Sequence, residues 1–176
     1  MKLTHLITAT IATLLSLSPA LAQSEFNKGD LAFNLDYALG SDDNNGSATN
    51  GFSLLAEYGF MNVINEKGTI SVGLLLGAGF NNNADLYKFH RVRIGTRGTL
   101  HYSFIPQLDT YGGLNFLFVD IEKTTLSDGT KISDTNVVVP ALVAGCRYMF
   151  TSAFGVNIET SWDRFQHLNL GLTFKF

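Results

Sequence analysis

The sequence predicts an all-β chain that folds as an eight-stranded antiparallel up-and-down β-barrel and crosses a membrane with its strands. Three observations predict this fold. Segments of about ten residues alternate between apolar and polar side chains. Long polar loops alternate with short turns. Only 15% of the residues are charged, against about 25% in a typical soluble domain, yet no apolar run after residue 22 approaches the ~18 residues of a spanning helix.

The first 22 residues have the layout of a secretory signal peptide. A short start with one basic residue, Lys2, precedes the uncharged apolar run LITATIATLLSLS, and the small-x-small pattern ALA follows. We expect residues 1–22 to be cleaved and residues 23–176 to form the barrel domain. The mature chain keeps 11 of the 12 basic residues against 15 acidic ones, which gives no indication of nucleic-acid binding. The single cysteine, Cys146, cannot form an internal disulfide.

The first three expected strands alternate cleanly, as a strand with one apolar face should. Residues 29–40 (GDLAFNLDYALG) place Leu, Phe and Tyr on one face and Asp, Asn and Ala on the other. Residues 51–60 (GFSLLAEYGF) repeat the pattern, with Glu57 on the more polar face. Residues 69–80 (TISVGLLLGAGF) oppose an apolar face to one made mostly of glycine and other small residues.

The fourth expected strand, residues 90–103, carries three arginines on one face. Arg91, Arg93 and Arg97 share the parity that lies opposite its apolar residues. Three buried guanidinium groups on one face need partners, because an unpaired charge is not tolerated in a dry apolar core. This strand therefore indicates an interior that contains acidic partners.

Four further strands complete the barrel. Residues 110–121 alternate less cleanly, because apolar residues from Val119 onward interrupt the polar face, and a β-bulge is expected there. A 13-residue polar loop precedes residues 137–150, a three-residue turn leads to residues 154–162, and the chain ends in HLNLGLTFKF, residues 167–176. Eight is an even number of strands, as in bacterial single-chain barrels.

The connections predict which ends of the strands share a side. Loops 41–50, 81–90 and 122–134 are long, and the connections between them are short. With both termini on one side, all the long loops emerge on the other. This alternation, with strands of about 9–11 residues, is typical of a membrane barrel.

The bulky faces are predicted to point at lipid. Phe, Leu and Tyr are too large to fill the narrow interior of eight strands, whereas Gly, Ala, Ser and Asn on the other faces fit it. Aromatic residues cluster near both strand ends, as the girdles of a spanning barrel do. We therefore expect a paired interior charge network. Its predicted members are Asp36, Glu57, Arg91, Arg93, Arg97, Arg147 and Glu159.

From about Phe26 to Phe176 the chain resembles the small eight-stranded outer-membrane barrels, the OmpA-transmembrane-domain and OmpX-like group. The most specific motif is the ending GLTFKF. The resemblance implies a monomer in the bacterial outer membrane, in contact with its lipid and lipopolysaccharide. It also implies that Leu172, Phe174 and Phe176 form a C-terminal signal read by the outer-membrane insertion machinery.

Members of this group act as adhesins, as envelope proteins and as lipid-modifying enzymes, and a fold does not choose among them. Our leading interpretation is a non-enzymatic barrel whose external loops act in surface interaction or adhesion with a surface or host partner, or which supports envelope integrity. The alternatives are a lipid-modifying enzyme, a narrow pore, and a soluble periplasmic barrel that binds a ligand.

No catalytic, cofactor-binding or metal-binding residue is predicted. The last hairpin is expected to bring Ser161, Asp163 and His167 to the outer mouth, with Ser161 facing Asn169, but polar residues lining a narrow barrel are expected anyway. The loop SDDNNGS lacks the full calcium-loop pattern. An eight-stranded barrel is also too narrow for an open aqueous channel.

Overall fold

The computed structural model describes most of the chain as strands and tight turns. The described residues are 26–40, 42–43, 47–48, 50–64, 67–83, 87–123, 135–162 and 167–176. At residues 42–43, 47–48, 80–83, 87–91, 120–123 and 135–137 the backbone alone is described. The predicted signal peptide lies outside the described residues, so its removal stays a prediction.

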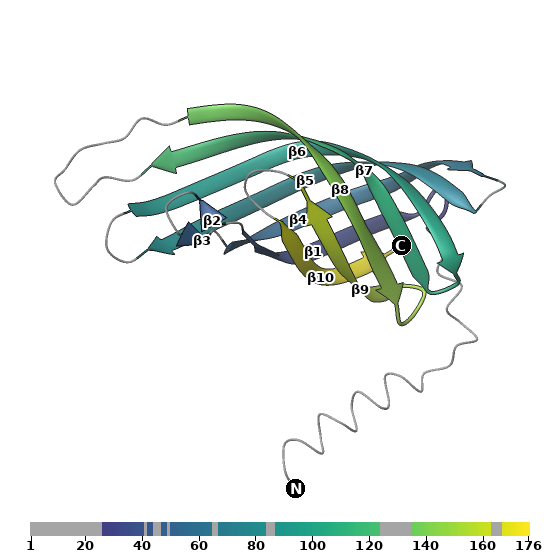
Figure 1. Ribbon diagram of the computed structural model, residues 1–176. Coiled ribbons are helices and arrows are strands. Elements are labelled where there is room, and N and C mark those ends of the chain that lie inside the picture. The colour runs from purple at the N-terminus through teal and green to yellow at the C-terminus, as the bar shows by residue number, and fades with distance from the viewer. Residues whose placement is uncertain are drawn as a thin grey trace, which may run out of the picture.

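In this part of the chain, eight strands close into one antiparallel barrel and two very short strands pair beside it (Figure 1). The barrel strands follow one another in chain order, and β1 closes the wall by pairing with both β4 and β10. The predicted up-and-down barrel is therefore confirmed, and each strand bound lies within three residues of its predicted place. The strands are β1 (Leu31–Leu39), β2 (Asp42–Asp43), β3 (Ser47–Ala48), β4 (Asn50–Val63), β5 (Gly68–Asn83), β6 (Tyr87–Ile105), β7 (Leu108–Lys123), β8 (Thr135–Met149), β9 (Phe154–Ser161) and β10 (Leu168–Lys175).

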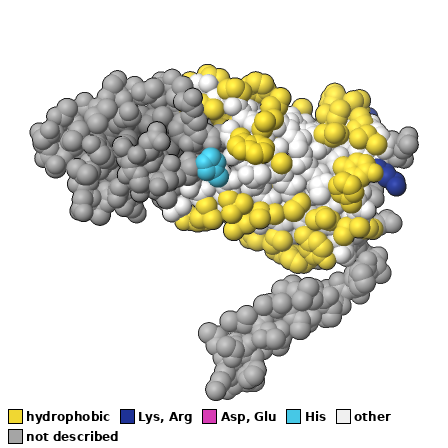
Figure 2. Space-filling model, in the orientation of Figure 1, with side chains coloured by type: hydrophobic (Ala, Val, Ile, Leu, Met, Phe, Trp, Pro, Cys, Tyr) yellow, Lys and Arg dark blue, Asp and Glu magenta, His cyan; other side chains and the backbone are white. Residues whose placement is uncertain are grey.

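Large apolar side chains cover the outside of the barrel. Phe52, Leu74 and Phe116 are 52%, 65% and 56% exposed, whereas Glu57 and Arg97 are almost fully buried inside. Figure 2 shows apolar side chains spread over the wall in one view. A soluble ligand-binding barrel would need the opposite arrangement, so the structure argues against that alternative. No helix among the described residues is long and apolar enough to cross a membrane.

The tight turns lie at one end of the barrel, where the two ends of the described chain also meet. Leu31 and Phe176 exchange two backbone hydrogen bonds of 3.0 and 2.9 Å. The turn between β4 and β5 contains Ile64 at a φ of 53°, and Gly29 turns the chain into β1 at a φ of 95°. Glycine adopts positive φ without a steric penalty. We call this end the short-turn end, and outer-membrane barrels place their short turns in the periplasm.

The barrel wall is taller on one side than on the other. Strands β5 to β8 contain 15 to 19 residues, whereas β1, β9 and β10 contain eight or nine. A tilted strand needs about 9–11 residues to cross the hydrocarbon core. The four long strands therefore continue past the membrane at the long-loop end, where Figure 1 shows them projecting together.

The predicted β-bulge near Val119 is wrong, because β7 pairs with β8 without a register shift. Shifts occur instead at the short-turn end, between Gly59 and Met61 and between Ser103 and Ile105. Val119 and Leu117 follow the ordinary alternation inward and are 0% and 1% exposed. Val119, which blurs the sequence pattern, therefore packs inside the barrel.

An arginine on the outer wall tests this orientation. Ile158 lies in the middle of β9 and faces outward at 44% exposed. Ile158→Arg should lower the free energy of unfolding by about 2–4 kcal/mol, because it places a charge in the hydrocarbon core. The measurement is equilibrium unfolding by urea in phospholipid vesicles.

The matched control is Phe104→Arg, which is 71% exposed beside the turn between β6 and β7. Near the membrane interface the same substitution should cost about 0–1 kcal/mol. An equal decrease in the free energy of unfolding for the two variants would contradict the placement of the apolar face in lipid.

Candidate functional site

The barrel interior is the candidate site, because its buried charges come from strands on all sides of the wall. At its centre Arg97 of β6 binds Glu159 of β9 through two hydrogen bonds of 2.7 Å, one from each terminal nitrogen. The Arg97 Nε also donates to the Asn115 side chain at 2.8 Å. Glu159 in turn accepts from the Tyr111 hydroxyl at 3.0 Å and from the Asn169 amide at 3.2 Å. A two-point guanidinium–carboxylate pair fixes both groups in one geometry.

A second ion-pair group lies towards the short-turn end. Glu57 of β4 binds the guanidinium of Arg147 through one carboxylate oxygen. Its other oxygen accepts from Ser71 at 2.8 Å and from Thr99, and it lies 3.2 Å from His101 Nε2. Four strands, β4, β5, β6 and β8, thus contribute to the contacts of one carboxylate, which links the wall across the lumen.

Within this second group, three side chains stand in the order of a nucleophile, a base and an orienting acid. Ser71 Oγ lies 3.1 Å from His101 Nε2, and His101 Nδ1 lies 2.9 Å from Asp109 Oδ2. Catalysis would also need an accessible hydroxyl and room for a substrate. Ser71 and His101 are 0% and 1% exposed, and the Ser71 hydroxyl donates to Glu57. This arrangement can fix protons inside the barrel, but it offers no path for an acyl group.

Phe26 closes the short-turn end of the interior. Its side chain is 4% exposed, and its ring centroid lies 4.5 Å from that of His101. The Arg147 guanidinium lies between two aromatic faces, 5.3 Å from the Phe26 centroid and 4.9 Å from that of Tyr111. Desolvated cation–π contacts of this kind are worth about 2 kcal/mol each. The N-terminal segment therefore covers the second ion-pair group and contributes to its packing.

The interior also contains an apolar cluster, so it is not charged throughout. Its members come from four strands and are all buried. They are Leu55, Leu75, Leu117, Val119 and Ala141, with Val139 packed against them. Large apolar residues thus fill part of a space that the sequence indicates is lined mostly by charged and small residues.

The predicted network members have different surroundings. Glu57, Arg97, Arg147 and Glu159 form the two ion-pair groups. Asp36 is buried but accepts a 2.6 Å hydrogen bond from the Asn157 amide, and none of the described ion pairs includes it. Arg93 is also buried, with its guanidinium directly over Gly77. Arg91 lies on β6, but its side chain lies outside the described residues.

The expected hairpin constellation does not form from the described residues. The strands pair with Ser161 opposite His167, and Glu159 opposite Asn169, so the turn is longer than the predicted three residues. Ser161 is buried inside the barrel, whereas His167 is exposed. Asp163 lies outside the described residues.

Sequence reasoning missed Asp109 and Tyr111 as members of the network. Asp109 was excluded because the expected strand began at residue 110, whereas β7 begins at Leu108. Its register partner is Arg147, so an earlier strand start would have revealed an acid–base pair. In the described part of the chain, no group of three or more acidic, histidine or cysteine side chains is arranged to hold a metal ion.

Three solved structures show how widely this barrel is used. Ail, the attachment invasion locus protein of Yersinia pestis, in complex with the heparin analogue sucrose octasulfate, has a TM-score of 0.58 at 14% identity, covering 85% of this chain and 99% of that chain. A de novo designed transmembrane β-barrel scores 0.54 at 20% identity, covering 86% and 99%. The outer membrane enzyme PagL scores 0.51 at 10% identity, covering 81% and 98%. At such identities the similarity shows the fold alone.

Sequence comparison gives a more specific result. The family described as "Outer membrane protein beta-barrel domain" matches residues 7–176. Comparison with curated proteins gives no significant match. The family match covers nearly the whole chain and agrees with the resemblance carried by the C-terminal strand.

Removing one partner of the central ion pair tests what holds the interior together. Glu159→Leu should lower the free energy of unfolding by about 3–5 kcal/mol, because Arg97 is left buried without its carboxylate. The double variant Arg97→Met/Glu159→Leu should lower the free energy of unfolding much less, because it leaves no buried charge without a partner. Urea unfolding in phospholipid vesicles measures both. If the double variant is as unstable as Glu159→Leu, the ion pair is not the stabilising element.

Proposed function

Because the chain belongs to the outer membrane protein beta-barrel domain family, we propose that it is a non-enzymatic protein of the bacterial outer membrane whose external loops make surface interactions. The single observation that carries the proposal is the filled interior. Two ion-pair groups, an apolar cluster and Phe26 occupy the interior. The long-loop end is therefore the region that remains for binding a partner.

The filled interior opposes the pore alternative. The Arg97–Glu159 pair spans the lumen between β6 and β9, and Glu57 reaches Arg147 between β4 and β8. A permeating ion would have to break both pairs. Replacing a buried charge pair by an unpaired charge costs several kcal/mol, which opposes steady conduction.

The taller side of the wall supports a role outside the cell. Strands β5 to β8 project past the membrane and carry the connections after Asn83 and Lys123 away from the lipid surface. A rigid scaffold that presents variable loops is the usual arrangement for binding. An attachment role would use this projecting edge.

The charge of the external segments indicates which partner class fits. Seven acidic and four basic residues occur in the predicted long loops, residues 41–50, 81–90 and 122–134, and in residues 163–166 of the last hairpin. A sulfated polysaccharide is recognised by a surplus of basic over acidic residues. In these segments the acidic residues outnumber the basic ones. Although Ail was solved with a heparin analogue, we propose a protein surface as the partner of this chain.

The enzyme alternative has weaker support. PagL is an outer membrane enzyme with a similar barrel, but at 10% identity that similarity concerns the fold. In this chain the Ser71–His101–Asp109 contacts are buried and saturated by Glu57. An acyl-transfer reaction would need the hydroxyl to meet a lipid substrate.

The C-terminal strand fits the proposed insertion signal. Leu172 and Phe174 lie on the outer face of β10, 41% and 39% exposed, and Phe176 is 76% exposed at the short-turn end. We propose that these three side chains are read by the insertion machinery before the barrel closes, and that they face lipid afterwards.

Shortening one external loop tests the proposal. Replacing residues 124–134 by a two-residue Asn-Gly turn should reduce attachment of intact cells to protein-coated surfaces or host cells at least about tenfold, the effect of losing one anchoring contact. The comparison is a deletion strain complemented with the wild-type or the shortened protein, with equal amounts in the outer membrane.

The control replaces the exposed turn of residues 151–153 at the opposite end, which should leave attachment unchanged. Resistance of the cells to detergent is measured in parallel. If the shortened strain attaches normally but loses detergent resistance, the loops serve envelope integrity and the proposed surface interaction is wrong.

A further inference from the structure

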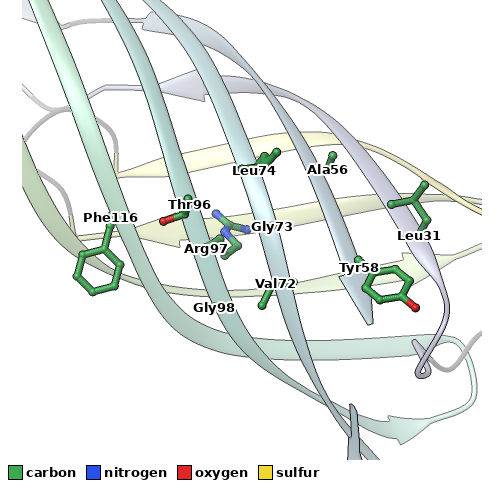
Figure 3. Close-up of a pocket in the computed structure, with 10 residues that line it drawn as sticks. All are labelled: Leu31, Ala56, Tyr58, Val72, Gly73, Leu74, Thr96, Arg97, Gly98 and Phe116. Atoms are coloured by element: carbon green, nitrogen blue, oxygen red, sulfur yellow. The ribbon is translucent and has the colours of Figure 1, made fainter. Parts of the chain in front are cut away.

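The outer wall of the barrel contains a groove of about 650 Å³ on the side of β1, β4, β5, β6 and β7. Its floor is formed by Ala56, Thr96 and Gly98. Larger side chains stand around this floor, among them Tyr58 and Phe116 (Figure 3). The groove opens on the lipid-facing surface, and the inward-facing positions Gly73 and Arg97 complete its lining.

The strand register explains why the wall is hollow there. Thr96 pairs with Leu74 on one side and Phe116 on the other. One row below, Gly98 lies between Val72 and Leu114. Small residues in the middle of rows of large ones leave a depression. A Cβ added at Gly98 would meet no other atom within 4 Å.

The groove lies at the depth of acyl chains from the periplasmic leaflet. Val72 lines it and lies five residues after Lys67, which precedes β5 at the short-turn end. Five residues span about 16 Å along a strand, or about 12 Å along the membrane normal at a 45° tilt. The hydrocarbon of one leaflet is about 15 Å thick. The groove therefore opens within that leaflet.

Basic residues lie at the membrane surface below the groove. Lys28 and Lys67 are both exposed, and the Lys28 backbone N–H donates to the Asn62 side chain at 2.7 Å, which places it beside the end of β4. The nearby Asp30 is paired with Lys175 at 3.1 Å. Glu66 precedes Lys67 in the sequence and lies outside the described residues. Two exposed lysines thus lie at the short-turn end of the barrel, on the same side of the wall as the groove.

We propose that the groove binds one acyl chain of an anionic glycerophospholipid from the periplasmic leaflet, with its phosphate facing Lys28 and Lys67. Hydrocarbon surrounds the groove, and water would find few hydrogen-bonding partners on its apolar wall. The basic side chains complement the phosphate and favour phosphatidylglycerol over a zwitterionic lipid. This site is independent of the external loops.

The test fills the groove and counts bound lipid. Native mass spectrometry of the full protein, released from detergent containing phosphatidylglycerol, should show one retained lipid. Gly98→Leu should lower retention about tenfold, because the new side chain occupies the floor. The matched control is Gly112→Leu, which adds the same side chain to the outer face of β7 outside the groove and should retain lipid as the wild type does.

Two further measurements identify the occupant. Lys28→Gln/Lys67→Gln should abolish the preference for phosphatidylglycerol over phosphatidylcholine. If Gly98→Leu fails to fold, Thr96→Leu fills the same floor and replaces it. Equal lipid retention by Gly98→Leu and Gly112→Leu would overturn the proposal. A wild-type dimer that Gly98→Leu converts to a monomer would also overturn it, since the occupant would then be a second copy of the chain.

Discussion

An interior too small to hydrate charges is the constraint on which the structure depends. Eight strands enclose just enough space for side chains, so a buried inward charge needs an ionic or hydrogen-bonding partner inside the barrel. Arg97 finds Glu159, and Arg147 finds Glu57, each between strands that are not neighbours in the wall. These contacts brace the closed sheet from within, where a soluble domain would have an apolar core.

Strand alternation turns most of the large apolar side chains outward. Phe116 and Leu74 alternate with inward-facing residues on their strands and are 56% and 65% exposed, so lipid surrounds them and their apolar surface does not meet water. The closed wall leaves no strand edge within the bilayer, where an unsatisfied backbone group would cost several kcal/mol. Stability and membrane insertion thus follow from one alternating pattern. Binding specificity then depends on the loops at the strand ends and on local features of the wall such as the groove.

Alternation in the sequence predicts the strands and the side of the wall on which each residue lies, because it depends only on neighbours along the chain. It cannot predict that Arg97 meets Glu159, since that contact depends on strand register and barrel closure over 62 residues. The position of Phe26 depends on the turn at Gly29, which has no periodic signal. In the sequence, Leu117 and Val119 interrupt the alternation of apolar and polar residues, and only their burial shows that they face inward.

The most direct test of the lipid-facing barrel compares the gel mobility of boiled and unboiled protein from isolated outer membranes. A closed barrel braced by buried ion pairs has no free edge to fray, so it should resist detergent at room temperature and migrate compactly until it is heated. A shift in mobility on boiling is the predicted result. Protein that washes free in buffer and migrates identically with and without boiling would contradict the assignment of inside and outside.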